Sequence, residues 1–253
     1  MISIVVLLSA ILMALQDRPA RTAETPWHDL EAELRQQGKP TDARSLTRLA
    51  ASESENEGTR WMAIEVLGLR GDKQAIETMN ALLRPSESRL IRESAALALA
   101  RLGDRRGIAA LEQMVGSAED PERRLSLAGH LAEFGSPVGY KYARQAALSE
   151  TERLRYLSVG ALVPFIPLEA AFKEERIDAS DRLVALLQDK SPDVRQEVLL
   201  YLSLAVEKGL PIQRVRPQVE SMTRQDKEPS LKEAARLLLI AWDEKLRQSK
   251  SKG

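Results

Sequence analysis

The chain has 253 residues, of which 43% are hydrophobic, 29% are charged and only 4% are aromatic. Its 37 basic and 37 acidic side chains balance, which argues against a nucleic-acid binder, since such proteins carry a basic excess. Cysteine is absent, so disulfides, thiolate metal sites and cysteine nucleophiles are excluded. A core built from Leu, Ala, Ile and Val with few aromatic residues favours helices over a β-sandwich.

Residues 1–16 carry no charged side chain and are mostly Ile, Val, Leu, Met and Ala. This stretch is short for a membrane span, which needs about 20 residues, and suits the apolar region of a signal peptide. No basic residue precedes it and its cleavage site is poor, so an uncleaved anchor and a buried helix stay open. We expect a signal peptide or membrane anchor at 1–16 and a linker at 17–25. The protein is then exported, periplasmic or extracellular, or membrane-anchored.

The rest of the chain repeats itself. Basic residues begin six copies, the first three at a spacing of 32 residues: Arg60, Arg92, Arg124, Arg155, Arg195 and Lys232. In every copy the seventh residue after the basic one is leucine: Leu67, Leu99, Leu131, Leu162, Leu202 and Leu239. Offsets of three, four and seven residues mark one face of an α-helix. Each copy is therefore predicted to hold a helix with one buried stripe, preceded by a second apolar helix.

Turn and cap residues agree with these helix boundaries. N-cap residues precede proline at Thr25-Pro26, Asp120-Pro121, Ser136-Pro137 and Ser191-Pro192. Capping-box spacing occurs at Ser149 with Glu152 and at Ser230 with Glu233, and helix-ending glycines are Gly71, Gly103 and Gly135. The predicted helix pairs are 42–70, 72–102, 105–134, 137–162, 180–210 and 211–246, with an extra element at 163–179. A capping helix is expected at 27–37 and a polar tail at 248–253.

The segment from Ile91 to Asp104, IRESAALALARLGD, and the turn Pro192-Asp193-Val194-Arg195 resemble the HEAT-repeat family, including its bacterial PBS-lyase-type repeats. The resemblance covers 42–246. It implies an all-α fold, a right-handed α-solenoid of five to six helix pairs spanning 26–247, whose open ends need capping elements.

Two interpretations of the basic column Arg60, Arg92, Arg124, Arg155, Arg195 and Lys232 stay open. The column could form a track for a polyanion. The resemblance implies instead that each arginine bonds to an aspartate of the preceding turn and braces neighbouring repeats, with Asp193 placed to serve Arg195. The balanced charge of the chain favours bracing.

Apolar residues stand where the resemblance places the concave surface of the second helices: Trp61, Leu125, Tyr156 and Leu200. They could pack between adjacent repeats. They could also line a groove for a protein or peptide, because exposed apolar patches mark interaction sites.

No pattern of catalytic, cofactor-binding or metal-ligating residues emerges. The histidines are two, His28 and His130, and no phosphate-binding or calcium loop occurs. We therefore expect a non-enzymatic scaffold that binds a protein or peptide and not nucleic acid. The alternatives are an accessory subunit of an enzyme, by analogy of fold with chromophore lyases, and polyanion binding by the basic column.

Overall fold

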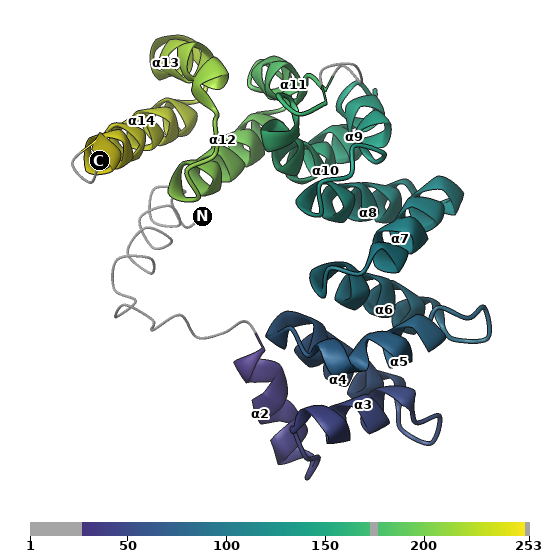
Figure 1. Cartoon of the computed structure of the whole chain (residues 1–253). Coiled ribbons are helices and arrows are strands. Elements are labelled where there is room, and N and C mark those ends of the chain that lie inside the picture. Colours follow the sequence, from purple (N-terminus) through teal and green to yellow (C-terminus); the bar gives the residue numbers. More distant parts are fainter. Residues whose placement is uncertain (1–26, 173–176, 251–253) are drawn as a thin grey trace. The chain divides into compact units, whose positions relative to one another are not determined.

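The computed structural model describes residues 27–172 and 177–250, which form thirteen α-helices, short 3₁₀ helices and no strand (Figure 1). These residues divide into two compact units, here called the N-terminal unit, before Ala118, and the C-terminal unit, from Ala118 onward. The boundary lies inside the predicted repeat 105–134. The predicted targeting segment 1–16, the linker 17–25 and the cap at Thr25-Pro26 fall outside the described residues.

The N-terminal unit contains α2 (His28–Gln36), α3 (Ala43–Ala51), α4 (Glu57–Arg70), η1 (Lys73–Ala75), α5 (Ile76–Ala81), α6 (Arg89–Arg101) and α7 (Arg105–Ser117). The C-terminal unit contains α8 (Pro121–Glu133), α9 (Tyr140–Ala147), α10 (Glu152–Leu162), η2 (Val163–Leu168), α11 (Ala179–Leu186), α12 (Pro192–Glu207), η4 (Gln213–Val215), α13 (Arg216–Gln225) and α14 (Pro229–Lys250). Within each unit, many consecutive helices pack together, such as α3 on α4 and α9 on α10, and so do alternate ones, such as α4 on α6 and α10 on both α8 and α12.

The leucine column is the inner stripe of the second helices. Five of its six members are completely buried: Leu67, Leu99, Leu131, Leu162 and Leu202. The sixth, Leu239, is half-buried, and its neighbour Leu238 takes the buried position with 3% exposure. Helical periodicity thus predicted the core face of five second helices and missed that of α14 by one residue.

Local cap chemistry sets most helix ends. Asn56, Ser88 and Asp120 each accept a hydrogen bond from a main-chain amide in the first turn of α4, α6 and α8. The predicted helix-ending glycines Gly71, Gly103 and Gly135 have φ of 77°, 80° and 79°, a left-handed conformation that favours glycine.

Three predicted helix starts are corrected by the structure. Ser136 and Pro137 lie in a turn, and α9 begins only at Tyr140. Ser149 accepts from the Thr151 amide at 3.1 Å and makes no capping box with Glu152. Ser230 lies inside α14, because Pro229 already takes the first helical position.

The core of the N-terminal unit joins α2 to the first helix pairs. Leu34 of α2 is fully buried, and Trp27 and Leu30 pack half-buried against the same core. Arg70 in α4 bonds to Glu31 of α2 at 2.9 Å. These contacts give α2 the role expected of an atypical end unit, which covers the open core of a repeat array.

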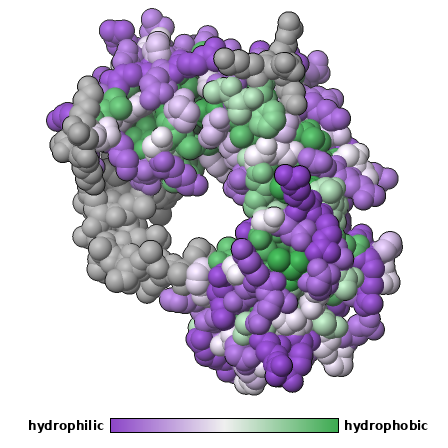
Figure 2. All heavy atoms as spheres, in the orientation of Figure 1, coloured by the Kyte–Doolittle hydropathy of each residue, from purple (hydrophilic) through white to green (hydrophobic). Residues whose placement is uncertain are grey.

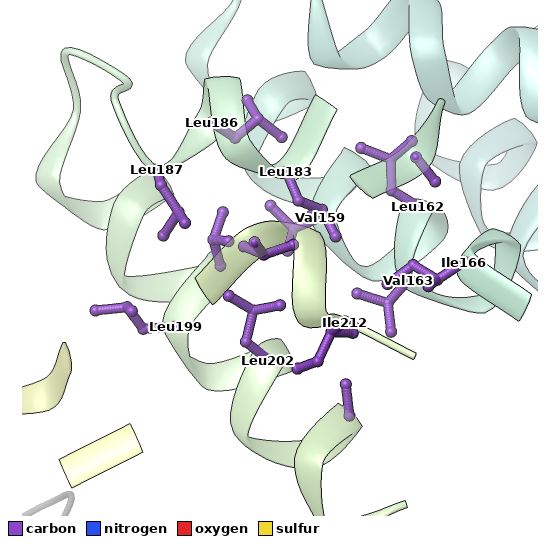
Figure 3. Close-up of a cluster of buried hydrophobic side chains, with 14 of the residues drawn as sticks. Val159, Leu162, Val163, Ile166, Leu183, Leu186, Leu187, Leu199, Leu202 and Ile212 are labelled. Carbon is purple, nitrogen blue, oxygen red and sulfur yellow. The ribbon is translucent and has the colours of Figure 1, made fainter. Parts of the chain in front are cut away.

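The core of the C-terminal unit runs through α10, η2, α11 and α12 (Figure 3). Val163 and Ile166 of η2 point into it beside Leu162, so the extra element is part of the core. At the end of the chain, Trp242 is 3% exposed. The helix α14 continues to Lys250, which corrects the predicted tail at 248–253.

Small residues let helices of the N-terminal unit approach closely. A Cβ built on Gly107 in α7 would lie 2.5 Å from both the main-chain nitrogen of Ala100 and the oxygen of Ala96 in α6. Backbone cannot yield as a flexible side chain can, so glycine is required there.

We predict that Gly107→Ala lowers the free energy of unfolding by about 1–3 kcal/mol, because the added methyl group forces α6 and α7 apart. Urea denaturation followed by circular dichroism measures this change. Gly116→Ala on the same helix is the matched control, since a Cβ there meets nothing within 4 Å. The control should leave stability unchanged or raise it by up to about 1 kcal/mol, from helix propensity alone. Equal effects of the two variants would contradict the packing argument.

Candidate functional site

The basic column stands in the first turns of the second helices. Arg60, Arg155 and Arg195 are buried, with at most 9% of their surface exposed. Each donates to a main-chain carbonyl that precedes its own helix, and so do the half-buried Arg92 and Arg124. Lys232 in α14 is also half-buried. The five arginines of the column therefore tie their helices to the segments that precede them.

Three of these arginines also pair with a carboxylate in the turn of the following helix pair. The pairs are Arg60 with Glu87, Arg155 with Asp189, and Arg195 with Asp226, at N–O distances of 2.9, 2.6 and 2.8 Å. Asp193 was expected to serve Arg195 but is exposed and lines a surface hollow. That expectation was wrong because the guanidinium reaches forward to the next turn.

The acidic partners are stabilised in their charged form. Burial raises the pKa of Asp189, but hydrogen bonds from Arg155 and the Ser191 amide outweigh it, so the net pKa lies below its ordinary value. The pKa of Asp226 is also lowered, because hydrogen bonds from Arg195 and the Glu228 amide outweigh the effect of burial. The positive charge of Arg60, Arg155 and Arg195 is therefore compensated inside the fold, which leaves these three members of the column little free charge for a polyanion.

The four predicted interaction residues do not form one cluster. Trp61 is half-buried in the N-terminal unit, where it packs against the core. Leu125 in α8 is only 4% exposed. Tyr156 in α10 and Leu200 in α12 are half-buried and line one hollow together. The C-terminal unit thus brings three of the four to neighbouring helices.

The hollow at Tyr156 and Leu200 has a volume of about 530 Å³ and lies between α10 and α12. The Arg153 guanidinium lies 6.0 Å from the centre of the Tyr156 ring and bonds to Glu122 of α8 at 3.2 Å. A hydrogen bond to Glu197, together with burial, raises the pKa of the Tyr156 phenol to about 12. The hollow therefore has an aromatic wall and a charged rim.

A second hollow of about 340 Å³ lies beside it, over α8, α10 and α12. Glycines at 129 and 160 open it, and a Cβ on Gly160 would lie 2.7 Å from the Tyr201 hydroxyl. Leu125 and the half-buried His130 also line it, and His130 bonds to Glu133 at 3.3 Å. Burial and the charge of Glu197 raise the pKa of Tyr201 above its usual value.

Together the two hollows define the α8–α10–α12 face. Its rim carries the carboxylates of Glu122, Glu133, Glu152, Asp193 and Glu197, against the single guanidinium of Arg153. Figure 2 shows hydrophobic residues surfacing in patches among hydrophilic ones. The sequence analysis did not identify Tyr201 and Glu197 as site residues. Tyr201 and His130 each stand six residues after a column arginine, and a polar side chain at that otherwise apolar position was a signal.

The described residues were also compared with the requirements of a metal site and of a membrane-spanning helix. Within 27–172 and 177–250, no three potential ligands among His, Cys, Asp and Glu come together for a metal ion. In the same ranges no helix is both long enough and apolar enough to cross a membrane.

A comparison with protein-family models matches residues 43–132 to HEAT repeats. The chain contains HEAT repeats. The match begins with α3 and ends in α8, and α10, α12 and α14 continue the column of basic residues beyond it. No curated protein matches the chain.

Several solved structures are similar to these HEAT repeats. YibA of Escherichia coli is 19% identical over 83% of this chain and 74% of its own, with a TM-score of 0.49. The complex of CpcE and CpcF of phycocyanin lyase from Nostoc sp. PCC7120 is 14% identical over 89% of this chain and 91% of that one, with a TM-score of 0.41. An engineered protein is 17% identical over 79% and 98%, with a TM-score of 0.39. At such identities the likeness concerns the fold alone.

We predict that Asp189→Asn lowers the free energy of unfolding by about 3 kcal/mol, because it leaves the Arg155 charge buried without its partner. Glu122→Gln is the matched control, since its pair with Arg153 is exposed by 48% and 60% on the two sides. Its effect should stay below about 1 kcal/mol. Chemical denaturation at neutral pH measures both, and similar losses would contradict a special role for the buried pair.

We also predict that the stability difference between wild type and Asp189→Asn depends on pH. The pKa of Asp189 in the folded chain lies below its ordinary value of 3.8. The stability that this carboxylate contributes is therefore complete above pH 3.8 and is lost as the pH falls through the folded-state pKa. The stability difference between wild type and Asp189→Asn should shrink in that acidic range. A constant difference down to the lowest pH would contradict it.

Proposed function

We propose that this HEAT-repeat chain is a non-enzymatic scaffold that binds a protein or peptide through the α8–α10–α12 face. The observation that carries the proposal is the pair of adjoining hollows: Tyr156 and Leu200 line the larger one, and Tyr201 lines the smaller one together with two glycines. Half-buried aromatic side chains beside pockets are typical centres of binding energy in protein interfaces. The helix pairs beneath, which we take to coil as right-handed solenoids, supply a surface that needs little rearrangement.

The charges of the rim indicate the chemistry of the partner. Five carboxylates and one guanidinium surround the two hollows, so the local potential attracts cations. A partner segment with Lys or Arg beside an apolar residue complements both the rim and the walls. Such binding weakens as salt concentration rises, because exposed charges are screened.

We also propose that the protein is exported or membrane-tethered. The support is the uncharged apolar stretch at residues 1–16, followed at once by Asp17, Arg18 and Pro19.

We predict that Leu200→Glu abolishes capture of a site-dependent partner. The half-buried side chain stands in the wall of the larger hollow, and a carboxylate there removes apolar contact without disturbing the core. Wild type and variant are immobilised and exposed to an extract of the host, and retained proteins are quantified by mass spectrometry. At least one protein should fall by about tenfold or more.

Ile240→Glu is the control for this experiment. Ile240 is a large apolar residue of α14 with 55% exposure and lines neither hollow. The control should retain the same proteins as wild type. Identical retention by Leu200→Glu would overturn the assignment of the α8–α10–α12 face, provided that circular dichroism shows all three proteins folded.

We predict that the full-length chain, expressed in its host and fractionated, is recovered in one of two forms. A cleaved signal peptide gives a soluble product that starts near Asp17, and an anchor gives a membrane-bound product that starts at Met1. Mass spectrometry of the N-terminal peptide distinguishes the forms. A soluble cytoplasmic product that still starts at Met1 would contradict export and tethering.

A further inference from the structure

Arg124 lacks the carboxylate partner that the next two arginines of the column, Arg155 and Arg195, possess. Arg155 and Arg195 each use Nε and Nη2 to grip an aspartate of the next turn, Asp189 and Asp226. Arg124 donates through Nη2 to the Ala118 carbonyl, while its Nε is buried and has no hydrogen-bond partner. A buried, unpaired donor on a charged group is costly, and native structures rarely keep one.

The position of the missing carboxylate can be identified from the turns. Asp189 and Asp226 stand six residues before the next basic residue of the column, and each accepts a hydrogen bond from the amide two residues on. Ser149 stands six residues before Arg155 and accepts from the Thr151 amide in the same way. Ser149 therefore occupies the aspartate position of its turn, but with a neutral side chain.

A hollow lies at this point of the C-terminal unit. It has a volume of about 400 Å³, and Arg124, Tyr142 and Ser149 line it together with apolar residues of α8, α9 and α10: Leu125, Ala146 and Leu154. Leu148, also in its wall, is 59% exposed. The lining is mostly apolar, and its polar side chains are those of Arg124, Tyr142, Gln145 and Ser149.

Positive charge gathers at the same end. The Arg124 guanidinium lies 5.1 Å from the centre of the Tyr142 ring, and the Lys141 ammonium lies 4.8 Å from it. Glu150, which follows Ser149, is exposed. Two cations thus share one aromatic ring here, whereas the next two arginines of the column, Arg155 and Arg195, each face an aspartate.

We infer that this hollow binds a carboxylate supplied by a protein partner, an aspartate or glutamate side chain that is followed by an apolar residue. The carboxylate takes the place that Asp189 and Asp226 fill for the next two arginines, and the apolar residue packs on Leu148 and Leu154. Because the Tyr142 ring covers the guanidinium, the ring tilts aside as the carboxylate reaches Nε. The inference rests on the proposed protein-binding role but concerns a site with the opposite charge preference.

The test uses the full chain labelled with ¹⁵N and the capped dipeptide acetyl-Asp-Leu-amide, with acetyl-Asn-Leu-amide as its neutral control. The Nε–H signal of arginine is visible by NMR, so Arg124 reports directly on binding. The aspartyl peptide should shift the Arg124 Nε–H signal and the amide signals of Tyr142 and Ser149. The asparaginyl peptide should shift none of them, because it lacks the charge that strengthens these hydrogen bonds.

Ser149→Asp is the decisive variant, since it adds the missing carboxylate from within and should not endanger folding. It should raise the melting temperature and weaken binding of the aspartyl peptide by about tenfold or more. Ser126→Asp places the same charge at an exposed position of α8 outside this hollow and should leave binding unchanged. No shift of the Arg124 signal in wild type, or equal binding by Ser149→Asp, would overturn the inference. The capture experiment with Leu200→Glu tests the α8–α10–α12 face separately, so failure of one proposal can be distinguished from failure of the other.

Discussion

A buried guanidinium at the start of the second helix holds consecutive helix pairs of the C-terminal unit together. Arg155 reaches back to carbonyls of its own preceding turn and forward to Asp189, so one side chain satisfies groups in two turns. The apolar stripe beneath it contributes the larger share of the burial, but apolar contact is not directional. The hydrogen-bonded pair adds direction, because Nε–H and Nη2–H donate to the two oxygens of a carboxylate in only one geometry.

The sequence predicted those features that depend on a single helix or turn. The buried face of five second helices follows from the leucine column, and the left-handed conformation of Gly71, Gly103 and Gly135 follows from their place after each helix. Contacts between helix pairs were harder to derive. Asp193 lies two residues from Arg195 in sequence, yet Asp226 is the partner, 31 residues away. Periodicity defines a face of a helix but does not say which turn of the next pair stands opposite.

The candidate face shows the same division. Tyr156 and Leu200 could be chosen from the sequence because their column is more apolar than a solvated surface requires. The hollow that they line could not be predicted from the sequence, because its volume depends on the separation of α10 and α12. Tyr201 shows why: its hydroxyl occupies the place left by the missing side chain of Gly160, and a pattern of single residues does not reveal such a pair.

The forward direction of the arginine pairs has a consequence for how such a chain can change length. The block from Arg155 to the residue before Arg195 contains both members of one such pair, the guanidinium of Arg155 and the carboxylate of Asp189. Deletion or duplication of this block therefore removes or adds a complete pair and leaves Arg195 with Asp226. A deletion that removes only one member of a pair leaves the other buried without its partner. The pairing thus makes the helix pair with its following turn a modular segment, one that recombination can add or remove without leaving an ionic group unsatisfied.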